Sequence, residues 1–106
     1  MKIRGGMGEF MRQAGRMQRK IDAKREELKT ELVEASAGND QVKATANGGH
    51  ELVKIEINPE LLKGEDLEMV QDLIVAASNA ALAKSREFVE AELEKVTGGL
   101  KIPGLT

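Results

Sequence analysis

The chain has 106 residues, a net charge of −2 and no cysteine, and 41% of its residues are hydrophobic. A chain of this length rarely supports two independent cores, so we expect a single domain over residues 1–106. The absence of Cys, Trp and Tyr, together with a single histidine, excludes disulfides, thiol nucleophiles and the usual zinc sites, and it disfavours binding of single-stranded nucleic acid by base stacking.

The charge is divided unevenly along the chain. Residues 1–25 carry eight basic and two acidic side chains, a net charge of +6, whereas residues 26–106 carry eight basic and 16 acidic side chains, a net charge of −8. Such a division indicates a polyanion-binding segment joined to an acidic body. The alternative is that the basic residues form a solvated helix face without a partner.

A long amphipathic helix is expected from residue 7 to about residue 29. Apolar residues recur along it with heptad spacing, with Lys24 at the one missing position: Phe10, Ala14, Met17, Ile21 and Leu28. Basic residues recur every four positions and form a ridge, with one more beside it: Arg12, Arg16, Lys20 and Lys24, then Arg19. This ridge can follow a phosphate backbone, pair with acidic neighbours or remain solvated. Residues 1–6 are expected to form a flexible basic arm.

From Thr30 the apolar period changes to two, which is typical of strands. Three short runs, at residues 33–37, 42–47 and 53–58, alternate apolar and polar side chains, and Gly-, Asn- and Asp-rich turns separate them. Asn47-Gly48 between two such runs predicts a hairpin, because both residues tolerate a positive φ. We therefore expect a three-stranded antiparallel sheet with one apolar face, covered by the helices.

A second long helix is expected from about Glu65 to Thr97, after a short turn that starts at Asn58-Pro59. Acidic residues in its first turn, Lys95 in its last turn and Gly98 after it match the preferences of helix ends. The fold class is therefore α+β. Residues 98–106 form an apolar tail that Pro103 and Gly104 interrupt.

These elements leave more apolar surface than one copy covers, and a surface of that kind usually marks an interface. A homodimer is the simplest arrangement, since twofold pairing is the commonest closed symmetry. Small residues dominate from Ala76 to Ala83, where another element can approach closely. We expect the dimer to be built around the sheet and this segment, with four residues at the interface: Ala76, Ala77, Ala80 and Ala81.

No catalytic or metal-binding pattern is present in the sequence. His50 lies in the expected hairpin turn and has no Ser or Cys partner placed by a recognisable motif. The glycine-rich segment 5–8 follows no strand and lacks the Gly-Lys-Ser/Thr ending of a phosphate loop. We expect no enzymatic activity, metal, cofactor or small-molecule substrate. No apolar run approaches the roughly 20 residues of a membrane helix, so we expect no membrane association and a cytoplasmic location.

Five segments, in this order and spacing, resemble the YbaB/EbfC family of bacterial nucleoid-associated proteins: GGMGEFMRQAGRMQ (5–18), VKATANGGH (42–50), KIEINPELL (54–62), DLIVAASNAA (72–81) and GGLKIPG (98–104). The resemblance covers nearly the whole chain. It implies a small dimer in which a three-stranded sheet is flanked by long helices that project like tweezer arms. It also implies binding of duplex DNA without catalysis.

The leading hypothesis is a nucleoid-associated protein that binds double-stranded DNA as a homodimer through phosphate contacts. Lys and Arg make such contacts, and duplex recognition by charge and shape needs no aromatic residues. The residues expected to contact DNA are those of the basic helix, with two auxiliaries on the arm: Arg12, Arg16, Arg19, Lys20 and Lys24, then Lys2 and Arg4. The alternative is a protein-binding adaptor or small chaperone, which the acidic body favours because it repels DNA.

Overall fold

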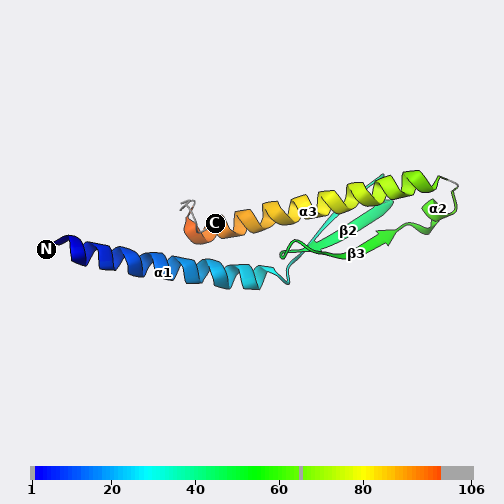
Figure 1. Cartoon of the computed structure of the whole chain (residues 1–106). Coiled ribbons are helices and arrows are strands. Elements are labelled where there is room, and N and C mark those ends of the chain that lie inside the picture. The colour runs from blue at the N-terminus through cyan, green and yellow to red at the C-terminus, as the bar shows by residue number, and fades with distance from the viewer. Residues whose placement is uncertain (1, 65, 99–106) are drawn as a thin grey trace.

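The computed structural model describes residues 2–64 and 66–98, and it is elongated, with extents of 77 × 19 × 16 Å (Figure 1). Its radius of gyration is 20.4 Å, whereas a compact chain of this length has about 13 Å. The elements in chain order are α1 (Lys2–Leu28), β1 (Leu32–Ala37), β2 (Val42–Asn47), β3 (Leu52–Ile57), α2 (Pro59–Leu62) and α3 (Leu67–Thr97). The predicted α+β class and order of elements are confirmed. The apolar tail, from residue 99 onward, lies outside the described residues.

Helix α1 starts five residues earlier than the heptad pattern indicates. It begins at Lys2 and runs through Gly5, Gly6 and Gly8. The segment 1–6, which was expected to be a flexible basic extension, is therefore helical from residue 2. Glycine lowers helix propensity, which is why the sequence places the start at residue 7. The flexibility expected of residues 1–6 stays a prediction.

The sheet has the strand order β1-β2-β3, and both pairs are antiparallel, as predicted. Ala44 of the central strand pairs with Ala35 on one side and Ile55 on the other, so these side chains share one face. The register shifts between Thr45 and Ala46, which leaves Val53 as an extra residue on β3. The apolar face therefore extends over all three strands.

The two hairpin turns use different residues for their left-handed positions. In the first turn, Gly38, Asn39 and Asp40 all have positive φ, as the turn sequence indicates. In the second turn the positive φ belongs to His50, at 63°, and not to Asn47-Gly48. The hairpin is confirmed, but the reason given for it was wrong.

Gly48 has another role. A Cβ built on it would lie 2.0 Å from the backbone oxygen of Leu28, and the Gly48 N–H donates to the backbone oxygen of Glu31 at 3.0 Å. A side chain at this position would therefore collide with the end of α1. Glycine is required here for close backbone approach.

One helix covers the sheet, and it covers only part of it. The first core lies between α3 and the apolar face, and its buried side chains are Val42, Ala44, Ala46, Leu61, Val70, Ala77 and Ala81. The central strand β2 is largely buried, but β3 keeps Leu52 at 41%, Val53 at 51% and Ile55 at 36% exposure. The prediction that both long helices cover the sheet was wrong, because α1 packs elsewhere.

The second core joins α1 to the last third of α3. Ile21 and Leu28 of α1 are buried against Val89 and Leu93 of α3. Figure 1 shows α1 lying alongside this part of α3 and its N-terminal half projecting beyond the end of α3. We call α1 and residues 85–97 the arm, and the strands, α2 and residues 67–84 the body. Helix α3 belongs to both.

Both ends of α3 are capped. The end at Gly98 is as predicted, whereas the helix begins at Leu67, with Asp66 as its N-cap and not in its first turn. The Asp66 side chain accepts a hydrogen bond from the Met69 N–H at 2.9 Å, and Gly98 adopts the left-handed conformation and donates its N–H to the Glu94 backbone oxygen. These caps satisfy backbone groups that a helix end otherwise leaves unpaired. They fix where α3 begins and ends.

Candidate nucleic-acid interface

Helix α1 has two chemically distinct faces over residues 12–28. The heptad positions Met17, Ile21 and Leu28 turn toward α3. At about 100° per residue, Arg12 and Arg19 lie roughly opposite to Ile21 on the helix circumference. The burial of one face against α3 therefore leaves the other face, with its arginines, directed to solvent.

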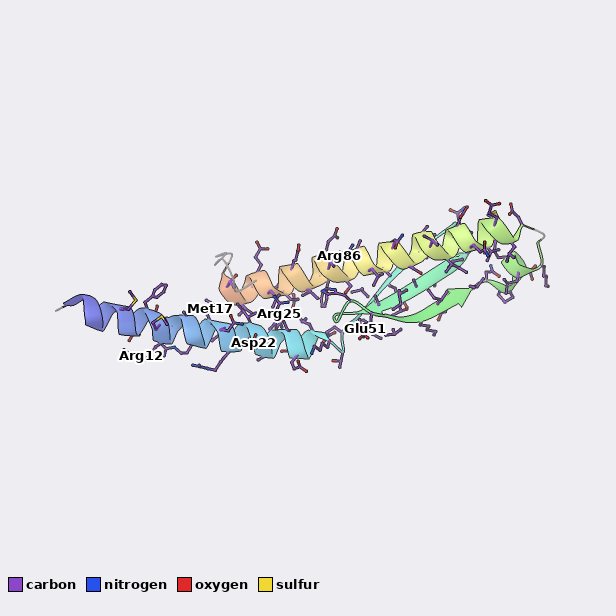
Figure 2. The ribbon with its side chains drawn as sticks, in the orientation of Figure 1. Arg12, Met17, Asp22, Arg25, Glu51 and Arg86 are labelled. Atoms are coloured by element: carbon purple, nitrogen blue, oxygen red, sulfur yellow. The ribbon has the colours of Figure 1, made fainter. Side chains whose placement is uncertain are left out.

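The structure brings three of the predicted DNA-contacting residues together. Arg12, Arg16 and Arg19, with Met11 and Gly15, line a shallow open depression of about 220 Å³ on α1. The side chains of Arg12 and Arg16 are 67% and 58% exposed, and Arg19 and Lys20 are also exposed. In Figure 2 Arg12 lies on the projecting half of α1, far from the sheet.

A carboxylate already faces two of these arginines. Glu9 Oε2 lies 2.7 Å from Arg12 Nη2, and Glu9 Oε1 lies 3.6 Å from Arg16 Nη2. Gln13 Nε2 also donates to Glu9 Oε1, at 3.5 Å. Exposed pairs of this kind contribute about 0–1 kcal/mol each. Glu9 therefore occupies the arginines weakly, and a phosphate can displace it.

Lys24 does not lie with the arginines. Its Nζ is 3.5 Å from carboxylate oxygens of both Glu27 and Glu92, and its side chain is only 25% exposed. The hydrogen bond from Lys95, together with the charges of Lys95 and Lys24, lowers the pKa of Glu92. Lys24 is thus placed to join α1 to α3 at the heptad position that the sequence left without an apolar residue.

Five other basic residues differ in what the structure shows of them. Lys2 and Arg4 belong to the first turn of α1, and their side chains lie outside the described part of the chain. Lys84 donates from Nζ to the backbone oxygen of Glu34 at 2.8 Å and so ties α3 to β1. Arg25 and Arg86 are exposed, and Figure 2 shows Arg86 projecting from the side of α3 turned away from the sheet. Sequence spacing gave no signal for Arg86, because no other basic residue accompanies it on α3 at ridge spacing.

The joint between arm and body is a hydrogen-bonded turn. The buried Ser85 donates from Oγ to the Asn47 backbone oxygen at 2.6 Å, and His50 Nδ1 lies 3.2 Å from the same Oγ. Because the hydroxyl's only hydrogen is already used, His50 Nδ1 carries a proton and donates. His50 is a turn residue, as predicted. Among the described residues, no group of three or more His, Cys, Asp or Glu is arranged to hold a metal ion.

The four alanines of the predicted dimer interface separate into two pairs. Ala77 and Ala81 are fully buried in the first core of the same chain. Ala76 and Ala80, one residue earlier on each turn, are exposed. Only Ala76 and Ala80 are therefore accessible to another copy, and the interface itself stays a prediction.

Fold and site together define a class of protein: a small α+β body that holds a projecting basic helix. The family model of the YbaB/EbfC DNA-binding family matches residues 3–100, and the chain belongs to that family. This membership confirms the predicted resemblance and the prediction of a protein without enzymatic activity. No helix among the described residues is both long and apolar enough to cross a membrane.

Several bacterial relatives match nearly the full length of the chain. A nucleoid-associated protein of Thermoanaerobacter pseudethanolicus is 48% identical over 93% of this chain and 89% of its own. One from Pelotomaculum thermopropionicum is 48% identical over 95% and 96%, and one from Myxococcus xanthus is 46% identical over 92% and 92%. The crystal structure of an uncharacterized protein from Helicobacter pylori has the same fold, with a TM-score of 0.67 and 23% identity over 79% of this chain and 88% of that chain.

Proposed function

We propose that this protein binds duplex DNA as a homodimer, mainly through phosphate contacts, and that it organises the nucleoid or modulates gene expression. The observation that carries the proposal is the two-faced α1 helix, which packs one face on α3 and presents Arg12, Arg16 and Arg19 on the other. Lys and Arg side chains dominate duplex binding. The YbaB/EbfC DNA-binding family and the nucleoid-associated relatives support DNA as the partner. A nucleoid location in the cytoplasm follows from that partner.

The projection of the N-terminal half of α1 reduces repulsion between DNA and the acidic residues of the strands, of α2 and of residues 67–84. Figure 1 shows the N-terminal half of α1 at one end of the molecule and the sheet at the other, and the molecule is 77 Å long. Electrostatic interactions between exposed charges are screened over about 8 Å at physiological ionic strength. The acidic residues of the body therefore have little effect on a duplex held near Arg12.

The proposed dimer rests on the uncovered apolar side of β3. Leu52, Val53 and Ile55 stay between 36% and 51% exposed on a strand that pairs on one side only. An open edge strand with large apolar side chains favours association with another chain. A second copy covers this surface, and the exposed Ala76 and Ala80 remain the predicted contacts on α3. Two arms double the phosphate contacts.

The experiment that tests DNA binding is a salt titration. If a dimer neutralises about four to eight phosphates, a plot of the logarithm of affinity against the logarithm of salt concentration has a slope of roughly −4 to −7. Affinity for a random duplex then drops by about 10² to 10⁴ between 50 and 200 mM salt. R16E combined with K20E should weaken binding to every duplex and flatten the slope. Circular dichroism verifies that the variant is folded.

The matched control is R86E. It reverses one exposed charge on α3, and we expect little change in affinity. Lys84→Glu should likewise do much less than the double variant, but it also breaks the bond to the Glu34 backbone, so R86E is the cleaner comparison. Unchanged affinity and slope in the folded R16E/K20E variant would show that DNA does not bind this face.

A second candidate function is protein binding by the arm. Met7, Phe10 and Met11 are 57%, 64% and 62% exposed on the part of α1 that extends past α3. Apolar side chains at a helix tip suit capture of another protein, as the adaptor or small chaperone hypothesis requires. The same titration separates the two functions, because apolar capture does not weaken between 50 and 200 mM salt.

A further inference from the structure

Gly15 lies in the middle of α1, where glycine destabilises a helix relative to alanine. Its φ is not in the left-handed region, and the helix continues through it for 13 residues on either side. The conformational freedom of glycine is therefore not used here. What the position provides is the absence of a side chain.

The backbone of Gly15, which no side chain covers, lines the depression between the arginines. Gly15 lies one helical turn from Arg12 and from Arg19, and beside Arg16, and all four line the same depression of about 220 Å³. A Cβ built on Gly15 would lie 3.5 Å from Arg19 Nη1. The guanidinium of Arg19 thus leans over the bare backbone, and a larger side chain would occupy the space between the arginines.

The depression suits one phosphate group in charge and in size. Three guanidinium groups border it, and guanidinium is the side chain that pairs best with phosphate oxygens. The depression is open to solvent, and its volume of about 220 Å³ leaves room for a phosphate group. The carboxylate of Glu9 contacts Arg12 and Arg16, and Arg19 completes the set of three guanidinium groups.

We propose that a backbone phosphate of duplex DNA binds in this depression and that Gly15 is a positioning residue of the interface. A bare helix surface lets the phosphate approach the axis of α1, so that Arg12, Arg16 and Arg19 reach its oxygens together. The proposal rests on the DNA-binding function proposed above and locates one of its phosphate contacts.

The test uses two substitutions that favour the helix and fill the depression. G15A adds a Cβ at ordinary contact distance from Arg19, and G15L adds a side chain that extends over the depression. Both should raise the melting temperature, because alanine and leucine are better helix formers than glycine. Affinity for a random duplex should fall by roughly threefold for G15A and on the order of tenfold for G15L. The salt slope of G15L should flatten by about 0.9 for each lost phosphate.

Ala91→Leu is the matched control, because it adds the same kind of bulk at an exposed position of α3 on the same arm. Its duplex affinity should equal that of the unmodified protein. Lower affinity with raised thermal stability in G15L is an outcome that a purely structural role for Gly15 does not produce.

Three results would overturn the inference. Unchanged affinity in G15L, with R16E/K20E still impaired, would refute the role of Gly15 and leave the DNA-binding function intact. Unchanged affinity in both variants would remove the function and the inference together. Saturable binding of inorganic phosphate that G15L abolishes, at unchanged duplex affinity, would identify an anion site unrelated to DNA.

Discussion

Glu9 is the acidic residue closest to the proposed DNA interface, and Glu9→Gln should strengthen DNA binding. Its carboxylate contacts Arg12 at 2.7 Å and Arg16 at 3.6 Å, so a phosphate that binds these arginines must displace it or bind beside a negative charge. Glutamine keeps the length of the side chain and a similar helix propensity. The substitution therefore removes the charge and leaves α1 otherwise unchanged.

The size of the effect follows from the exposure of the pair. Exposed ion pairs contribute roughly 0.2–1 kcal/mol, and half of the Glu9 side chain is exposed. If two arms bind one duplex, the free energy of binding improves by about 0.4–2 kcal/mol, which corresponds to an increase in affinity of about twofold to 30-fold. The effect should shrink at higher salt, because screening weakens both the pair and the phosphate contact.

Fluorescence anisotropy with a labelled random duplex at fixed salt measures this change. Glu90→Gln is the control, since it removes one exposed carboxylate from α3 and not from the helix that carries Arg12, Arg16 and Arg19. An affinity that rises equally in both variants would show that net charge matters and the local pair does not. An affinity that Glu9→Gln leaves unchanged would refute the argument that Glu9 competes with phosphate.

Two further predictions concern assembly and pH. Ala80→Glu should leave the protomer folded and weaken the proposed dimer by at least about tenfold, as measured by sedimentation. Ala81→Glu places a charge in the first core and should unfold the chain, at a cost on the order of 5 kcal/mol. If the unmodified protein is monomeric at micromolar concentration, the prediction for Ala80→Glu has no basis. Because the pKa of Glu92 is lowered in the folded state by the Lys95 hydrogen bond and nearby charges, its stabilising effect is present above the ordinary carboxyl range and is lost as pH falls through the lowered value. Glu92→Gln should therefore flatten the loss of melting temperature between about pH 7 and pH 3, and an identical pH profile would contradict it.

The local elements could be predicted from the sequence because each has a short-range cause. Periods of two and of three to four residues marked the strands and helices. The acidic residues near its start and Gly98 after it marked the ends of α3 to within two residues. The arrangement of the helices depends on long-range contacts that periodicity does not contain. Nothing in the heptad pattern of α1 distinguishes packing on the sheet from packing on the last third of α3, and the structure shows the second.

The structure brings only part of the predicted DNA-contacting set together, because ridge spacing was treated as a straight line. A step of four residues turns a helix by about 400°, so a ridge drifts by roughly 40° at each step. From Arg12 to Lys24 this drift reaches about 120°, which moves Lys24 from the outer face to the α3 contact and its pairs with Glu27 and Glu92. The role that we propose for Gly15 has no signal in such a pattern, since a glycine has no side chain that a charge pattern can count.

The contact between α1 and α3 also determines the order in which the chain completes its fold. Ile21 and Leu28 pack on Val89 and Leu93, so α1 is synthesised first and acquires its intrachain partner last. At about 5–20 residues per second, the roughly 70 residues between them take on the order of 4–14 s to synthesise. During that interval the strands and the first half of α3 have what they need to form the body, whereas α1 remains an unpaired amphipathic helix with a basic face. Because the basic face stays exposed when α1 packs on α3, a polyanion bound to it during synthesis leaves Ile21 and Leu28 free to pack on Val89 and Leu93.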